Sequence, residues 1–118
     1  MNEQRLPDLL ATMHRAAFNA LSFVNGIGFE EFLSDIKTQQ AVVMSLIVIG
    51  ENSARAIAKY PSVVDQFDQI PWRSMRGMRN RIAHNYDETN FEIVWKVILE
   101  ELPKLILNIE IVQKQLNA

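Results

Sequence analysis

The chain has no cysteine, only two histidines, and no apolar run long enough to cross a membrane. The absence of cysteine excludes disulfides and thiolate metal sites within the chain, and two histidines disfavour a histidine-rich metal site. The longest apolar run, residues 41–50, has about half of the ~20 residues that a membrane-spanning helix needs. The segment MNEQRLPDLL contains acids and lacks the apolar core of a secretion signal. We therefore expect a cytoplasmic protein with no membrane contact, metal or cofactor.

Strand-like alternation of apolar and polar residues is also missing, and apolar residues recur at helical spacing instead. A chain of 118 residues with 48% hydrophobic residues fits one domain with one core. The pattern predicts an all-α, four-helix up-and-down bundle with short extra helical turns, formed by residues 1–118 as a single helical domain. The expected long helices cover about residues 6–24, 38–60, 71–85 and 91–116, with short turns near 29–35 and within 61–70.

Several single residues make local predictions. Gly50, inside the second long helix, indicates close approach of another backbone because it has no side chain. Pro71 is expected as the first residue of the third helix, and Pro103 is expected to kink the fourth. Thr89 followed by Glu92 has the spacing of a capping box before the fourth helix. The second helix is apolar almost all round in its first half, so we expect it to be the most buried element.

The acidic residues are unevenly distributed. Residues 71–86 contain four arginines and no acidic residue. The whole chain has a formal net charge of −2. Removing the four arginines from 12 basic residues leaves 8 against 14 acids, so the other 102 residues carry −6. A basic island on an acidic body attracts a small anion or a short stretch of phosphate backbone. It lacks the extent of a non-specific DNA-binding surface.

One polar stripe is expected along the third helix, because its members follow one another at spacings of three, four and four. The stripe consists of Arg73, Arg76, Asn80 and His84. Arginine offers a planar fork of donors to phosphate oxygens, and histidine can give or take a proton near neutral pH. The alternative is a solvated face, with the histidine favoured by the helix dipole.

The same segment carries a motif. Arg79, His84 and Tyr86 spell RxxxxHxY, and Asn80 directly follows the arginine. This motif resembles the signature of HEPN-domain ribonucleases, specifically the HepT-like toxins. The resemblance extends over about residues 40–105, through IGENSARAIAKYP, IPWRSMRGMRNRIAHNY and NFEIVWKVILEELP.

The resemblance implies a small HEPN-like all-α protein that forms a homodimer and cleaves RNA without a metal. Arg79 would hold the scissile phosphate, His84 would act as general base or acid, and Asn80 would support positioning. The ribose 2′-hydroxyl would attack phosphorus and leave a cyclic phosphate. Arg73 and Arg76 are the further substrate-binding candidates.

Tyr86 has a separate implied role in this resemblance. In HepT-like pairs of type VII, a minimal nucleotidyltransferase antitoxin modifies this tyrosine with AMP, and the added charge and bulk would block RNA. The other interpretation is that Tyr86 only caps or packs the helix end. A different function for the whole chain is a non-catalytic substrate-binding or scaffold subunit of a nucleotidyltransferase.

The spacing of the motif raises a geometric question. Five residues on an ideal helix separate Arg79 and His84 by about 140° in direction. Either the helix distorts before His84 or the site forms where two copies meet. Glu51 and Asn52, polar residues in the apolar second helix, are possible support; Glu51 could pair with Arg55 or orient Arg79 or His84.

Overall fold

The computed structural model describes residues 5–117 and has an all-α architecture in that range, as predicted. The α-helices are α1 (Leu6–Phe23), α2 (Phe29–Leu33), α3 (Ile36–Lys59), α4 (Pro61–Gln66), α5 (Trp72–His84), α6 (Phe91–Lys96) and α7 (Leu102–Leu116). A 3₁₀ turn, Tyr86–Glu88, follows α5, and a π-helical segment, Val97–Glu101, joins α6 to α7. The short helices expected near 29–35 and within 61–70 are therefore α2 and α4.

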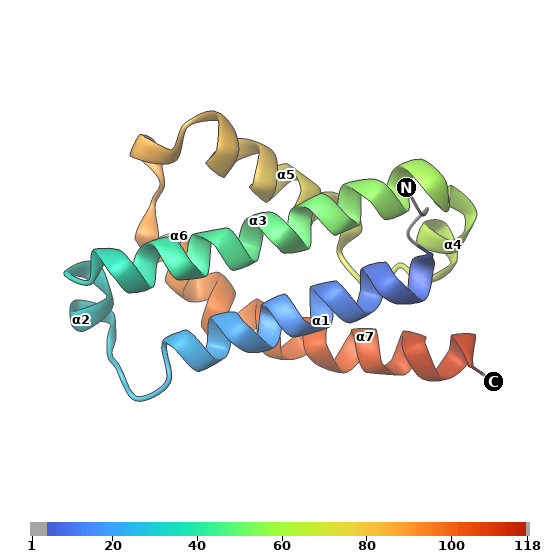
Figure 1. The fold of residues 1–118 in the computed structure, drawn as a ribbon, viewed down its shortest axis with the longest axis horizontal. Coiled ribbons are helices and arrows are strands. Elements are labelled where there is room, and N and C mark those ends of the chain that lie inside the picture. The colour runs from blue at the N-terminus through green and yellow to red at the C-terminus, as the bar shows by residue number, and fades with distance from the viewer. Residues whose placement is uncertain (1–4, 118) are drawn as a thin grey trace.

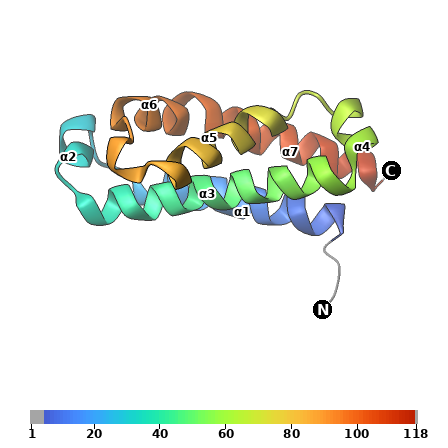
Figure 2. The ribbon, with the colours of Figure 1, turned by 90° about the horizontal axis from the view of Figure 1, so that it is seen from above.

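The long helices run up and down, with α3 between α1 on one side and α5 on the other (Figure 1). Helix α7 packs against α1, and α6 continues into α7 (Figure 2). One continuous cluster of buried apolar side chains fills the space between these helices. This arrangement leaves the end of α5 and the turn before α6 at the outside of the bundle.

Helix α3 begins at Ile36, two residues before the predicted start, because Asp35 is its N-cap. The carboxylate of Asp35 accepts hydrogen bonds from the backbone N–H of Thr38, at 3.1 Å, and from its hydroxyl, at 2.6 Å. These hydrogen bonds hold the pKa of the Asp35 carboxyl below its ordinary value. The lowered pKa stabilises the fold at neutral pH, and this contribution is lost as the pH falls through the folded-state pKa.

The apolar character of α3 is not matched by burial all round. Ile36 and Met44 are exposed, whereas Val42, Leu46 and Ile49 are buried. Among the described residues α3 still has ten buried residues, against seven in α1, so the prediction that it is the most buried element is confirmed. Part of its surface is exposed because only two neighbouring helices, α1 and α5, pack extensively on it. By length and composition alone α3 could cross a membrane, and half of its apolar window is buried inside the protein.

Gly50 lies where α3 and α5 cross, as its sequence position predicted. A Cβ atom at Gly50 would overlap the Cβ of Arg79 and would lie 2.7 Å from the carbonyl oxygen of Met75. The two backbones can approach this closely only because the position has no side chain. The crossing brings the polar residue that follows, Glu51, next to α5.

The last long helix departs from the prediction at both its start and its middle. Asn90, not Thr89, is the N-cap, and its side-chain oxygen accepts from the backbone N–H groups of Glu92, at 2.9 Å, and Ile93, at 3.3 Å. The helix is also irregular near Pro103, where the sequence predicted a kink, because a π-helical segment ends at Glu101 and α7 begins at Leu102. Pro71 is likewise the N-cap of α5 and not its first residue.

Candidate active site at the end of α5

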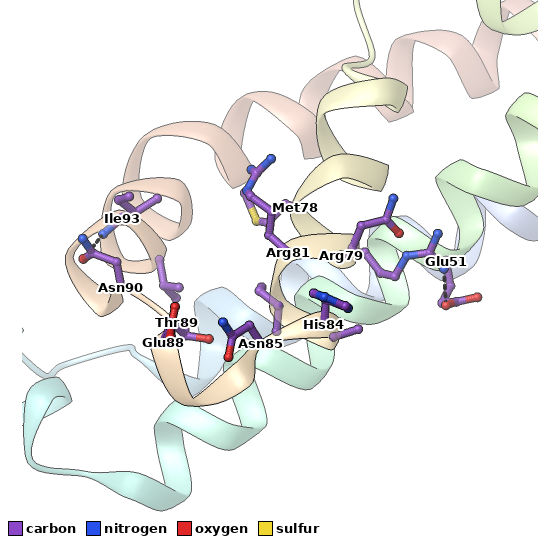
Figure 3. A pocket seen from close by; sticks show the side chains of 14 residues that line it. Glu51, Met78, Arg79, Arg81, His84, Asn85, Glu88, Thr89, Asn90 and Ile93 are labelled. Atoms are coloured by element: carbon purple, nitrogen blue, oxygen red, sulfur yellow. Dashed lines mark hydrogen bonds and ion pairs between the residues drawn. The ribbon is translucent and has the colours of Figure 1, made fainter.

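An open hollow surrounds the C-terminal turns of α5 and has a volume of about 1000 Å³. Eight successive residues, 78 to 85, line it, so the hollow follows the circumference of the helix and not one face only. Its other walls come from Glu51 on α3 and from the turn and first residues of α6. Figure 3 shows these side chains around α5.

Arg79 and Glu51 form an ion pair across the α3–α5 crossing, between the Nη1 and Oε1 atoms. The Arg79 side chain is only 20% exposed, and that of Glu51 is 42% exposed. The Nε atom of Arg79 is buried and has no hydrogen-bond partner among the described residues. Of the two predicted alternatives for Glu51, the contact with Arg79 is present, and both residues line the hollow. The carboxylate thus holds the guanidinium in one direction.

His84 and Asn80 also line the hollow, and both are exposed. Helix α5 is regularly α-helical through His84, and the backbone leaves the helix only at Asn85. The possibility that the helix distorts before His84 is therefore excluded. Arg79 faces α3, and on an ideal helix His84 points about 140° away from it, so helix geometry alone does not place the two groups side by side within one chain.

Four predicted site residues do not line the hollow: Arg73, Arg76, Asn52 and Tyr86. Arg73 is exposed and forms an ion pair with Asp65 at 3.3 Å, a surface interaction that contributes little to stability. Arg76 is partly exposed on the same helix. Asn52 is buried within α3, where its Nδ2 atom donates to the carbonyl of Val48 at 2.8 Å. Among residues 5–117, the Oδ1 atom of Asn52 has no hydrogen-bond partner, so it forms no hydrogen bond to the candidate site there.

Tyr86 lies two residues beyond His84, at the start of the 3₁₀ turn, and is half-buried. Its ring meets the ring of Phe91 edge-on, with centroids 6.5 Å apart. The expected packing of the ring is therefore present, and it leaves part of the side chain accessible. A half-buried ring on a turn beside the hollow remains compatible with modification.

The sequence prediction missed part of the site. Arg81 lines the hollow and is exposed, and no described carboxylate lies within ion-pair distance of it. Met78 from α5 and Ile93 from α6 line the same side. The only sequence signal for Arg81 was its membership of the basic island, because it belongs neither to the motif nor to the polar stripe.

The protein is an all-α bundle, and the RxxxxHxY motif lies at the end of α5, next to an open hollow. These are the features of a HEPN-like protein. A family model described as Ribonuclease HepT-like matches residues 13–112. The chain therefore belongs to the HepT-like ribonuclease family, as the motif indicated.

Curated relatives agree with this membership. A Methanocaldococcus jannaschii protein named "Putative RNase MJ0127" is 36% identical over 96% of this chain and 88% of the relative. "Putative RNase TTE0752" of Caldanaerobacter subterraneus is 37% identical over 78% of this chain and 80% of its own. "Probable ribonuclease HepT" of Thermococcus cleftensis is 37% identical over 70% of this chain and 73% of the relative. No solved structure matches the chain.

Proposed function

We propose that this protein is a metal-independent endoribonuclease, the toxin of a type VII-like toxin–antitoxin pair in the cytoplasm. The observation that carries the proposal is the joint exposure of Arg79, Asn80 and His84 to one open hollow. Family membership and the ribonuclease names of the relatives support the reaction class. A phosphate-binding cation and an imidazole are the two groups that RNA transesterification requires.

The chemistry follows from these groups. His84 takes the proton of a ribose 2′-hydroxyl, whose oxygen attacks the adjacent phosphorus. The bond to the 5′-oxygen breaks, a 2′,3′-cyclic phosphate forms, and a protonated imidazole returns a proton to the leaving oxygen. Arg79 stabilises the negative charge that develops on the phosphoryl oxygens, and Asn80 orients the ribose or the phosphate. Arg73 and Arg76 bind flanking phosphates along the outward face of α5.

The active form is a two-fold homodimer in which two α5 ends share one cleft. This part of the proposal rests on the regularity of α5 through His84, which separates Arg79 and His84 within one chain. A second copy, related by a two-fold axis, can supply the missing group to each half of the cleft.

Tyr86 is the point of control in the proposed pair. A minimal nucleotidyltransferase antitoxin transfers AMP from ATP to its hydroxyl, with pyrophosphate as the leaving group, and the added phosphate lies two residues from His84. The negative charge repels RNA phosphates, and the adenosine blocks the approach to the hollow. The partial exposure of Tyr86 on a turn supports its accessibility to another enzyme.

Cleavage of RNA by purified wild type and by His84→Ala, in excess chelator, tests the function. Loss of general acid–base catalysis costs roughly 10²–10⁴-fold, so we expect cleavage with cyclic phosphate ends by the wild type and almost none by the variant. His84 is exposed, so both proteins should have the same circular dichroism spectrum and melting temperature.

Equal cleavage by both proteins would reject the assigned site. No cleavage by either protein, with both folded and Tyr86 unmodified by mass spectrometry, would favour the non-catalytic subunit.

A further inference from the structure

The hollow has two sides with different electrostatic character. On the side of α3, the charge of Arg79 is balanced by Glu51. On the side of α6, no described carboxylate pairs with Arg81. Figure 3 shows the side chain of Arg81 between α5 and α6, on the opposite side of α5 from Glu51. Arg81 is therefore the arginine of the hollow that has no ion-pair partner among the described residues, although the carboxylate of Glu88 also lines the hollow.

Of the two arginines that line the hollow, Arg79 and Arg81, Arg81 is the nearer in direction to His84 within one chain. Residues three apart on a helix differ by about 60°, whereas the five-residue separation from Arg79 gives about 140°. Helix α5 is regular over this range, so these directions apply. The Arg81 guanidinium lies back over Gly77, where a Cβ atom would be 3.4 Å from its Nη1 atom. The small residue leaves room for this orientation.

Apolar and amide groups complete this side of the hollow. Ile93 is 57% exposed although it lies in the first turn of α6, and Met78 is partly exposed beside Arg81. Asn85 and Asn90 supply side-chain amides at the rim. Thr89 contributes a buried hydroxyl oxygen without a hydrogen-bond partner among the described residues. Apolar side chains, side-chain amides and an arginine that line one hollow suit a base with its phosphate.

We propose that the α6 side of the hollow is a nucleotide-binding subsite for RNA, in which Arg81 binds a phosphate neighbouring the cleaved bond and Met78 and Ile93 support the face of a base. The proposal rests on the proposed ribonuclease function, since it concerns the same strand. It assigns to Arg81 a binding role that is separate from the role of Arg79. The planar guanidinium fork of Arg81 matches the oxygen atoms of a phosphate, so we expect a phosphate, and not another protein surface, as the occupant.

The test measures the affinity of a short single-stranded RNA by fluorescence anisotropy at several salt concentrations, in the cleavage-inactive His84→Ala background. We expect Arg81→Ala to weaken binding about 10- to 100-fold and to lower the slope of log affinity against log salt by about one. The affinity of Arg81→Lys should lie between those of the parent and of Arg81→Ala, because lysine keeps the charge but lacks the planar guanidinium fork. Arg15→Ala, an exposed arginine of α1, is the matched charge control and should bind like the parent.

Ile93→Ser tests the base surface, with Leu107→Ser of α7 as the control, since both side chains are about equally exposed apolar residues. Ile93→Ser should weaken RNA binding at every salt concentration without changing the slope, because no charge is removed. A change of molecular mass in light scattering for Ile93→Ser alone would identify a subunit contact and overturn the base assignment.

The binding experiment separates this subsite from the ribonuclease proposal. Unchanged affinity and slope for Arg81→Ala, or an equal loss for Arg15→Ala, would overturn the subsite even if the wild type cleaves RNA. If the wild type does not cleave but Arg81→Ala still loses affinity and slope as expected, the subsite stands and the ribonuclease function fails.

Discussion

Arg79 and Arg81 lie two positions apart on α5, yet their surroundings are opposite. Arg79 faces α3, is mostly buried, and has a carboxylate partner in Glu51. Arg81 is exposed and lacks such a partner among residues 5–117. A paired, partly buried guanidinium has a fixed direction, which suits stabilisation of charge in a transition state. An exposed guanidinium without an ion-pair partner can change its position together with a flexible RNA strand.

The Glu51–Arg79 pair leads to a prediction at this scale. Glu51→Gln keeps an acceptor but removes the charge that orients Arg79, and Glu51→Ala removes both. We expect kcat for RNA cleavage to fall about 10- to 100-fold, more for Ala than for Gln, with KM nearly unchanged. Steady-state kinetics separates the two constants.

Glu100→Gln, an exposed carboxylate outside the hollow, is the control for Glu51→Gln and should match the wild type. A lower KM with an unaltered kcat in Glu51→Gln would mean that Glu51 only competes with RNA for Arg79. That result would contradict the positioning role.

The polar residues of the site also illustrate what a motif leaves undecided. Sequence reasoning selected Arg79, Asn80 and His84, and all three line the hollow. It also selected Asn52, which lies in the protein interior, and overlooked Arg81. Helical spacing gives relative directions on one helix, but it does not say which direction faces a neighbour.

At the scale of the helices, the crossing of α3 and α5 at Gly50 determines where Arg79 lies. Any Cβ atom at this position must displace the backbone of α5, since it would lie 2.7 Å from the carbonyl oxygen of Met75. The crossing is therefore both a packing feature and the reason that Glu51 reaches across to α5.

Two glycine substitutions are expected to change stability in opposite directions. Gly50→Ala should lower the free energy of unfolding by about 1–3 kcal/mol, because it overpacks the helix crossing. Gly77→Ala, inside α5, should raise it by about 0.5–1 kcal/mol, because only the flexible end of Arg81 is near. Urea denaturation followed by circular dichroism measures both; a loss of similar size in the two variants would refute close packing specific to Gly50.

The fourth predicted helix shows the limit of local patterns at this scale. Its apolar spacing extends from Phe91 to Leu116, but the structure contains a π-helical segment before Pro103. Proline lacks the N–H that a regular helix would use, which explains where the interruption lies. The choice of Asn90 over Thr89 as N-cap depended on which side chain could reach the first free N–H groups.

For the molecule as a whole, the central prediction concerns two copies. If each cleft combines Arg79 of one subunit with His84 of the other, mixing Arg79→Ala and His84→Ala subunits creates heterodimers with one intact site. Random pairing gives such heterodimers in half of the population, so about a quarter of wild-type activity should return. The measurement is RNA cleavage after refolding the two inactive proteins together.

The controls for this mixing experiment are each variant refolded alone, which should stay inactive. No recovery in the mixture, with dimers present by light scattering, would place Arg79 and His84 of each site within one chain. A protein that cleaves at full rate as a monomer would also refute the shared cleft.

The sequence by itself determined the helical class, the approximate helix bounds, the close approach at Gly50 and the candidate site residues Arg79, Asn80 and His84, which line the hollow. These features depend on periodicity and on single residues, which act over a few positions of the chain. Only the tertiary structure decided that Glu51 pairs with Arg79, that α5 stays regular through His84, and that Arg81 and Ile93 share one side of the hollow. Such contacts join segments that are distant in sequence, and the packing of whole helices sets which side chains meet.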